Sequence, residues 1–241
     1  MQRPEILSKV EILYRDDDLI AAFKPSGLLV HPYREAIGVK ECLLKEVRRL
    51  TGQFLYPIHR LDRPVSGIVL FGLSSLIVKE IKSEWSNSGN IKEYITLVRG
   101  VLNEPGKFNF PLGNEQKIKQ EAETHYWPLH QFEEMTLVKV RILTGRKHQI
   151  RRHFSRRMHQ IIGDTGYGKG PINQVFRSEY GMNRIFLHAH YLRIFNPVKE
   201  NYQEFHSPLP DDLVLVLNKL GLPNYLEVLN KSSELGPICE E

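Results

Sequence analysis

The nonapeptide HRLDRPVSG, residues 59–67, decides how the rest of the sequence is interpreted. Its proline has no N–H and favours an extended conformation in the residue before it. Alternate side chains of an extended segment share one side, so Arg60 and Asp62 should lie together. Ser66-Gly67 has the composition of a turn, and the apolar run over residues 67–73 is typical of a buried strand. The stretch therefore predicts a short charged segment in front of a buried strand.

Asp62 is the only carboxylate of this stretch, and it lies near two arginines, Arg60 and Arg63. Opposite charges nearby keep a carboxylate ionised. A surface ion pair is the common explanation of such a cluster, and pairs of that kind contribute little to stability. A functional site is the alternative, because Leu61 would pack beneath a charged segment that opens a buried strand. Spacing alone leaves both explanations open.

A second stretch, TGRKHQIRRH at residues 144–153, predicts a glycine turn and then a basic helix that starts near Arg146. The free N–H groups and the positive dipole end of such a helix attract anions. Arg151 is expected at the edge of the buried helix face, where it can reach a neighbouring carboxylate. That face is predicted from three apolar residues at every fourth position: Ile150, Phe154 and Met158.

The positive charge of the chain is concentrated around this second stretch. The whole sequence has a net charge of +5, from 33 Lys and Arg against 28 Asp and Glu. Residues 139–163 contain eight Lys and Arg and no acidic residue. A local excess of this kind indicates a nucleic-acid partner, although a solvated helix face gives the same pattern.

The remaining elements predict an α+β fold with a mixed, mainly antiparallel sheet, because the strands come in hairpin-like clusters and helices are few. We expect one domain over residues 1–230 and a frayed tail over residues 231–241. Gly52 is expected to end a helix, and Ser74 to cap the start of the next one. Strands are predicted at 10–14, 19–23, 67–73, 94–102, 122–129, 135–143 and 185–195, and helices at 39–50, 74–86, 211–220 and 224–229.

Composition and missing motifs exclude several classes of protein. The 241 residues are 41% hydrophobic and 10% aromatic, which excludes disordered and collagen-like chains. Cys42 and Cys239 fit no disulfide framework or metal spacing, and no signal or membrane-spanning segment is evident, so a soluble cytoplasmic protein is expected. Neither histidine pair, His148 with His153 or His188 with His190, has a third ligand at zinc spacing. Nucleotide-binding glycine motifs and a nucleophile elbow are also missing, so neither a zinc site nor a nucleotide cofactor is expected.

Three stretches in a fixed order give the sequence a family resemblance. KPSGLLVH at residues 24–31, HRLDRPVSG at 59–67 and TGRKHQIRRH at 144–153 resemble the motifs of RluA-type RNA pseudouridine synthases. The resemblance covers about residues 10–210. It implies the pseudouridine synthase catalytic fold with a central RNA-binding cleft, without the S4 RNA-binding domain of some relatives. It also implies that uridine is isomerised to pseudouridine in structured RNA without a metal or cofactor.

The resemblance assigns roles to individual residues. Asp62 corresponds to the essential aspartate, and Arg60 to the arginine that enters the RNA stack and displaces the target uridine. Tyr94 corresponds to the tyrosine that packs against the target base, and Arg151 to the arginine that forms a salt bridge with the aspartate. The sequence departs from the family pattern at three supporting positions: Phe23, Val65 and Gln160.

The RNA substrate is the least determined part of the prediction. The doubled basic pattern RKHQIRRH, together with the segment GLSS at residues 72–75, is similar to the branch of the family that modifies uridine 65 of tRNA. Ribosomal RNA is the first alternative, and a non-catalytic RNA-binding protein on the same fold is the second. A monomer is expected. Five cations are predicted to contact RNA phosphates: Lys139, Arg146, Lys147, Arg152 and Arg156.

Overall fold

The computed structural model describes residues 5–32, 41–168 and 170–231. Within these ranges the chain forms two compact units. The first unit contains Met1–Ile91 and Ala189–Ser207, and the second contains Lys92–His188 and Pro208–Glu241. The predicted tail, apart from Lys231 at the end of the last helix, lies outside the described residues.

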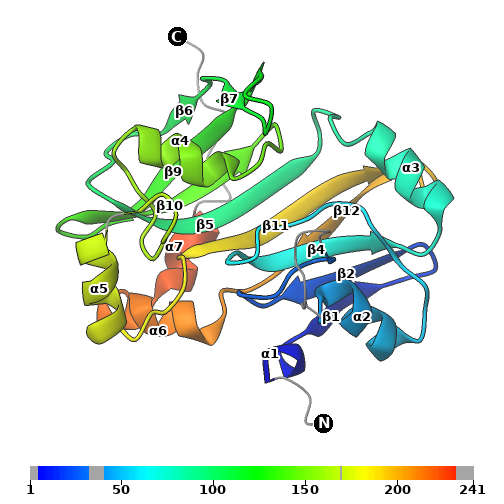
Figure 1. Cartoon of the computed structure of the whole chain (residues 1–241), viewed down its shortest axis with the longest axis horizontal. Helices are drawn as coiled ribbons and strands as arrows, with labels where there is room; N and C mark the ends of the chain where they lie inside the picture. The colour runs from blue at the N-terminus through cyan, green and yellow to red at the C-terminus, as the bar shows by residue number, and fades with distance from the viewer. Residues whose placement is uncertain (1–4, 33–40, 169, 232–241) are drawn as a thin grey trace. The chain divides into compact units, whose positions relative to one another are not determined.

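The first unit is built on a sheet with the strand order β1-β2-β4-β11 (Figure 1). Strand β12 pairs with β11, and the short strand β3 pairs with β4, both antiparallel. The hairpin predicted at the N-terminal end is present as β1 and β2, which also pair antiparallel. The strands are β1 (Glu11–Arg15), β2 (Leu19–Lys24), β3 (Tyr56–Pro57), β4 (Ser66–Gly72), β11 (Leu187–Asn196) and β12 (Asn201–His206), and the helices are α1 (Glu5–Ser8), α2 (Leu43–Thr51) and α3 (Ser75–Ser83).

The two predicted helix caps of this unit are confirmed. Ser74 has extended backbone angles, and its hydroxyl oxygen accepts a hydrogen bond from Ile77 N at 3.2 Å, which satisfies one N–H at the start of α3. Gly52 has a φ of 69° and donates its N–H to Arg48 O at 2.8 Å, which ends α2 in the left-handed conformation that glycine adopts without strain.

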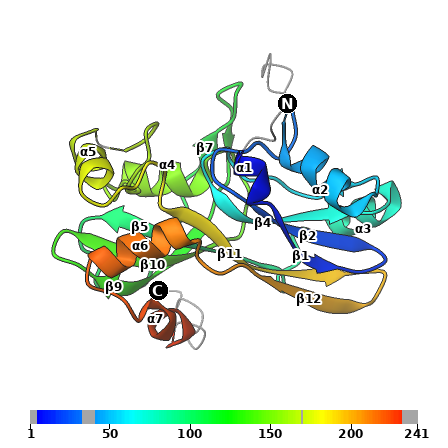
Figure 2. The ribbon, with the colours of Figure 1, turned by 90° about the horizontal axis from the view of Figure 1, so that it is seen from below.

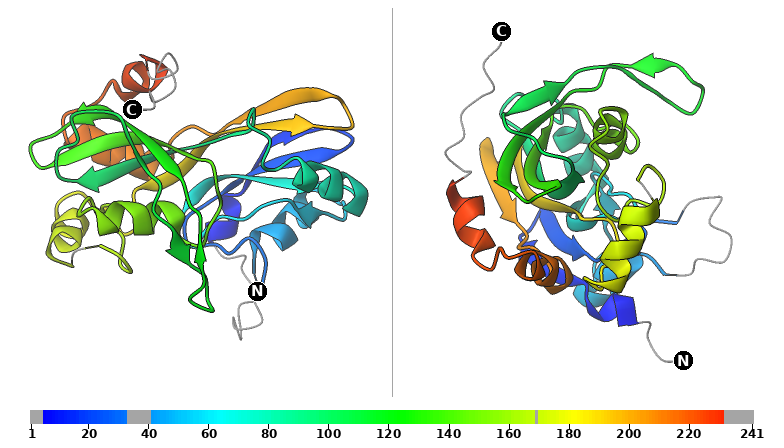
Figure 3. Two further views of the ribbon diagram at one scale, coloured as in Figure 1. Left: turned by 90° about the horizontal axis from the view of Figure 1, so that it is seen from above. Right: turned by 90° about the vertical axis from the view of Figure 1, so that its left-hand side faces the viewer.

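The second unit is built on antiparallel strands in the order β5-β10-β9-β6. Helix α6 lies across β5 and β10 (Figure 2), and its Leu213 and Leu217 share one core with Leu97 and Leu137. A separate hairpin, β7 with β8, extends away from these strands (Figure 3). The strands are β5 (Ile91–Arg99), β6 (Gly106–Phe108), β7 (Leu112–Gly113), β8 (Lys119–Gln120), β9 (Thr124–Gln131) and β10 (Met135–Ile142), and the helices are α4 (Gln149–Arg156), α5 (Gly170–Ser178), α6 (Asp211–Lys219) and α7 (Tyr225–Lys231).

The α+β class with mainly antiparallel pairing is confirmed, but two local predictions are wrong. Ser66 and Gly67 are already part of strand β4, and the turn lies earlier, where Val65 N donates to Asp62 O. Met158 is not a core residue, since it is 61% exposed and has a φ of 65°. Helix α4 ends at Arg156, so the four-residue period no longer applies there. Seven elements of the described ranges were not predicted: helices α1 and α5 and strands β3, β6, β7, β8 and β12.

None of the helices in the described part of the chain has the length and apolar content needed to cross a bilayer.

Gly67 gives a direct test of the packing of strand β4. Its φ is 122°, and an added Cβ would overlap the backbone oxygen of Ala189, so Gly67→Ala combines backbone strain with a clash that only backbone movement relieves. We expect the substitution to lower the free energy of unfolding by about 3 kcal/mol or more. Gly52→Ala is the matched control, because φ is also positive there but no atom lies within 4 Å of the new Cβ, and it should cost only about 1–2 kcal/mol. Equal losses in urea unfolding would contradict the clash.

Candidate active site

The charged segment in front of β4 has the predicted alternation. Leu61 is buried, Asp62 is half-buried and Arg60 is exposed. The N–H of Val65 donates to Asp62 O at 3.1 Å, so the segment closes as a tight turn just before the strand begins. The buried leucine anchors the turn between two charged residues that are both more exposed than it is.

Lys24 fixes this turn to the loop that follows strand β2. Its side chain has no exposed surface, and its ammonium group donates to Pro25 O at 3.0 Å, Leu28 O at 2.8 Å and Arg63 O at 3.1 Å. A buried ammonium group is stable only when its donors are satisfied, and three carbonyl oxygens satisfy it here. The KPSG stretch therefore acts as a support for the Asp62 turn.

Three more hydrogen bonds join the same two loops. Gly27 N donates to Arg63 O at 2.8 Å, and Ser26 Oγ donates to Pro64 O at 2.7 Å. The Arg63 guanidinium returns a bond from Nε to Gly27 O at 2.9 Å. Because each bond closes on a backbone carbonyl, the path of the Asp62 turn is fixed by the backbone of the neighbouring loop.

His59 ends the β3–β4 pairing immediately before Arg60. Ile58 N donates to Leu70 O at 3.0 Å, and Leu70 N donates in turn to the His59 Nε2 at 3.1 Å, where a strand carbonyl would otherwise accept. The imidazole also stacks on Trp85, with ring centroids 5.3 Å apart. The chain therefore leaves the sheet edge at Arg60 in a fixed direction.

Gln149 organises the second basic stretch in the other unit. Its Oε1 accepts from Thr144 Oγ1 at 2.8 Å and from Arg146 N at 3.0 Å, and its Nε2 donates to Glu123 O at 2.9 Å and Thr124 Oγ1 at 3.0 Å. Helix α4 consequently begins at Gln149 and not at Arg146, because the side chain of Gln149 holds residues 144–146 in a loop.

Arg151 is buried at the edge of helix α4, as predicted, and forms a bidentate ion pair with Asp164. Its Nε donates to Asp164 Oδ2 at 2.8 Å and its Nη2 to Asp164 Oδ1 at 2.9 Å. Asp164 Oδ1 also accepts from Gly166 N and Tyr167 N, and the guanidinium lies 4.9 Å from the Tyr167 ring. Although burial alone would raise the pKa of Asp164, its bonds to Arg151 outweigh that effect and lower it.

Tyr94 lies on strand β5 of the second unit, half-buried and opposite Val140 of β10. The preceding Glu93 is buried and accepts from the Arg141 Nη2 at 2.7 Å. The first unit thus holds Arg60 and Asp62, whereas the second holds Tyr94 and Arg151.

The five predicted phosphate contacts differ in exposure. Arg146, Lys147 and Arg156 are exposed and Arg152 is half-buried, whereas Lys139 is 4% exposed on strand β10. Burial lowers the pKa of Lys139. Only the four cations of the loop and helix α4 therefore present much of their side chains to solvent.

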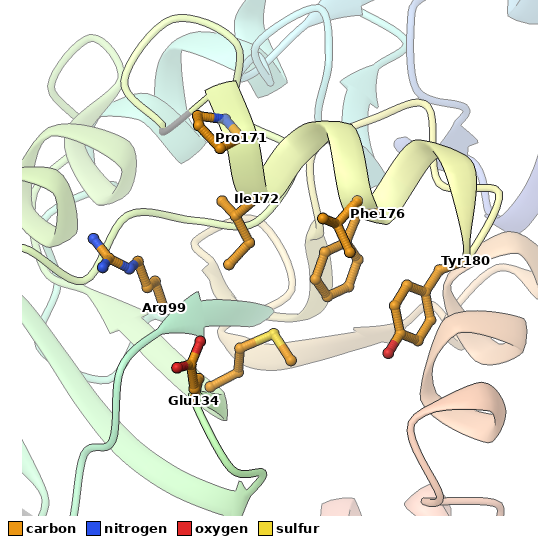
Figure 4. Close-up of a pocket in the computed structure, with 8 residues that line it drawn as sticks. Arg99, Glu134, Pro171, Ile172, Phe176 and Tyr180 are labelled. Carbon is orange, nitrogen blue, oxygen red and sulfur yellow. The ribbon is translucent and has the colours of Figure 1, made fainter.

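A cavity of about 590 Å³ lies between helix α5 and the ends of strands β5 and β10 (Figure 4). Its walls are mainly apolar, with Ile172, Phe176 and Tyr180 on one side and the charged pair Arg99 and Glu134 at one end. None of the predicted site residues lines it.

Comparison with known proteins gives one consistent result. The family model described as RNA pseudouridylate synthase matches residues 18–156. The chain belongs to this family. It is 36% identical to "tRNA pseudouridine synthase C" of Vibrio cholerae over 88% of this chain and 96% of that protein. It is 37% identical, with the same coverage, to the protein of that name from Haemophilus ducreyi.

Solved structures of the family share the fold. The human protein "RNA Pseudouridylate Synthase Domain Containing 4" has a TM-score of 0.72 at 22% identity, over 87% of this chain and 92% of that chain. The human "RNA Pseudouridylate Synthase Domain Containing 1" also has a TM-score of 0.72, at 21% identity, over 99% and 100% of the two chains. The predicted membership of the pseudouridine synthase family is confirmed, and the protein is a pseudouridine synthase that acts on RNA.

Two supporting residues of this pseudouridine synthase were missed by sequence reasoning. Lys24 was noticed only as part of a motif, because its acceptors lie up to 39 positions away. Asp164 follows Arg151 by 13 positions and carries no local signal except the flanking glycines, Gly163 and Gly166. Only the fold brings these partners together.

The Arg151–Asp164 pair predicts a large difference between two adjacent arginines. Arg151→Ala leaves the buried Asp164 carboxylate without its guanidinium partner and should lower the free energy of unfolding by about 3–5 kcal/mol. Arg152→Ala is the matched control, since the structure gives this side chain only a bond to Lys147 O, at 3.3 Å, and the loss should stay below about 1 kcal/mol. Thermal or urea unfolding measures both, and similar losses for Arg151→Ala and Arg152→Ala would contradict the assignment.

His153 predicts a dependence of stability on pH. It has no exposed surface, and its two nitrogens bond to Thr124 Oγ1 at 2.9 Å and Phe110 O at 3.1 Å. Burial lowers the pKa of His153 to about 4, so the unfolded chain takes up the proton first as the pH falls. The contribution of neutral His153 to the free energy of unfolding should be complete above about pH 6.5. As the pH falls towards 4, the free energy of unfolding should decrease by up to about 3 kcal/mol.

The measurement is urea unfolding at intervals across this pH range. In His153→Gln the slope of the unfolding free energy against pH should become shallower, whatever the absolute stability of the variant. An unchanged slope would contradict the role of His153.

Proposed function

We propose that this enzyme converts uridine to pseudouridine in tRNA, with uridine 65 as the target. The observation that carries the proposal is the identity of 36–37% with relatives named tRNA pseudouridine synthase C, over 88% of the chain. The pattern RKHQIRRH within residues 144–153 supports the same branch of the family.

The reaction requires three changes at one nucleotide. The N1–C1′ bond breaks, the freed uracil turns, and a C5–C1′ bond forms, while C5 loses a proton and N1 ends with one. We assign the catalytic role to Asp62, which attacks the sugar, attacks the base or removes the C2′ proton. Each of these routes needs an ionised carboxylate in a fixed position. The turn that Lys24 supports is suited to that need.

The other residues prepare the nucleotide and the aspartate. Arg60 is exposed at the turn and displaces the target uridine from the RNA stack, a step that costs a few kcal/mol. Tyr94 provides a surface for the displaced base. Arg151, which Asp164 already holds rigidly, keeps Asp62 charged. Phosphate contacts are assigned to five cations: Lys139, Arg146, Lys147, Arg152 and Arg156.

Asp62→Asn separates chemistry from folding and binding. The amide keeps the size of the side chain but has no charge and cannot act as nucleophile or base. We expect RNA affinity within about twofold of the wild type and a loss of turnover of at least about 10⁴-fold, as for the removal of other essential nucleophiles. The release of tritium from tRNA labelled at uridine C5 measures turnover, because C5 loses its hydrogen in the reaction. Measurable turnover by the variant would contradict the role of Asp62.

Chemical mapping of pseudouridine in total RNA tests the substrate. A strain that lacks this gene should lose the modification at position 65 of tRNA, and a plasmid with the wild-type gene, but not Asp62→Asn, should restore it. If that strain instead loses a pseudouridine in ribosomal RNA and keeps those in tRNA, the substrate is ribosomal RNA.

A further inference from the structure

An exposed aromatic side chain lies on the first unit, outside the groups assigned above. Phe54 follows helix α2 and is 62% exposed. Tyr56, two residues further on, is 36% exposed, and the two rings meet edge to face with centroids 5.1 Å apart. Single exposed apolar residues are ordinary, but two adjoining aromatic rings that both remain exposed form a larger accessible patch.

Arg48 of helix α2 holds the Phe54 ring in place. The guanidinium carbon lies 3.9 Å from the ring centroid, and Arg48 Nη2 donates to Leu55 O at 2.7 Å. A cation at this distance covers part of the ring, and the side chain of Phe54 still remains 62% exposed. The ring is therefore ordered before any ligand arrives, so binding costs little side-chain entropy.

The charges around the ring favour an anionic partner. Two neighbouring arginines of helix α2, Arg48 and Arg49, differ in their partners, because Arg48 lies over the Phe54 ring and Arg49 pairs with Glu46. That acid is only 3% exposed and pairs with Arg49 at 2.7 Å. In the part of the chain that the structure describes, no carboxylate pairs with Arg48. The charge that lies directly over the ring is thus positive, which suits a phosphate backbone better than the apolar core of a protein interface.

We propose that Phe54, supported by Arg48 and bordered by Tyr56, is an accessory RNA-binding site that stacks one unpaired base of the substrate. An aromatic ring next to cations is the combination by which proteins bind single-stranded nucleic acid without reading its sequence. The proposal rests on the RNA substrate proposed above, but it concerns a contact that contributes to binding and not to the chemical step.

The test compares Phe54→Ala with Leu76→Ala in the full chain. Leu76 lies on helix α3 of the same unit and is 72% exposed, so its truncation removes an equally accessible apolar side chain. The probes are unfractionated tRNA and a fluorescein-labelled oligoadenylate of about ten nucleotides, followed by fluorescence anisotropy. Phe54→Ala should weaken binding of the oligonucleotide by about 5-fold to about 100-fold, and Phe54→Trp should restore it. Leu76→Ala should bind as the wild type does.

Steady-state kinetics and sedimentation complete the test. With tRNA as substrate, Phe54→Ala should raise KM and leave kcat unchanged, because the chemical groups are intact. The proposal would be overturned if Phe54→Ala had the same RNA affinity and KM as Leu76→Ala. It would also be overturned if Phe54→Ala changed self-association but not RNA affinity, because the rings would then belong to a protein contact. Failure of the wild type to form pseudouridine would refute the proposed function instead, since oligonucleotide binding is measured independently of it.

Discussion

The Asp62 turn depends on the hydrogen bonds that the ammonium group of Lys24 donates to backbone carbonyls. This group is buried without exposed surface, and its acceptors belong to two loops that are far apart in the sequence. Hydrogen bonds from a charged donor contribute about 1.5–3 kcal/mol each, whereas an unsatisfied buried ammonium costs far more. The two loops can therefore not separate without exposing or stranding the charge. A carboxylate that must be positioned before substrate arrives benefits from such a support, because the energy of ordering is spent during folding.

The second unit holds its buried arginine, Arg151, in a different manner. Arg151 is held by a carboxylate, Asp164, that itself accepts two backbone N–H groups. Removal of one partner of a buried pair is costly, so the pair defines one conformation more than it adds stability. In each unit a buried charge is thus satisfied by a group far along the chain, Arg63 O for Lys24 and the Asp164 carboxylate for Arg151.

The limits of sequence reasoning follow from the range of the interactions involved. Ser74 and Gly52 were predicted because a cap is decided by residues within one helical turn. The periodic pattern failed at Met158, where α4 had already ended two residues earlier, and the composition of Ser66-Gly67 resembled a turn although both residues belong to a strand. The roles of Lys24 and Asp164 depend on acceptors and donors that only the tertiary fold supplies. Local chemistry thus predicted the elements, and the family resemblance the candidate site residues, but neither predicted the network that supports them.

The basic stretch shows the same difference between sequence and structure in its electrostatics. Of the eight cations at residues 139–163, Arg141 pairs with Glu93, Lys147 with Glu115 and Arg151 with Asp164, and Lys139 is buried. Among the described residues, four cations have no carboxylate partner: Arg146, Arg152, Arg156 and Arg157. Arg156 and Arg157 each lie over the Phe110 ring, at 5.5 and 5.3 Å, so their charges are held near the surface beside an aromatic face. Counterion release depends on the phosphates that a protein neutralises, not on the cations in its sequence. The fold therefore pairs or buries half of the cations that the sequence concentrates in this stretch.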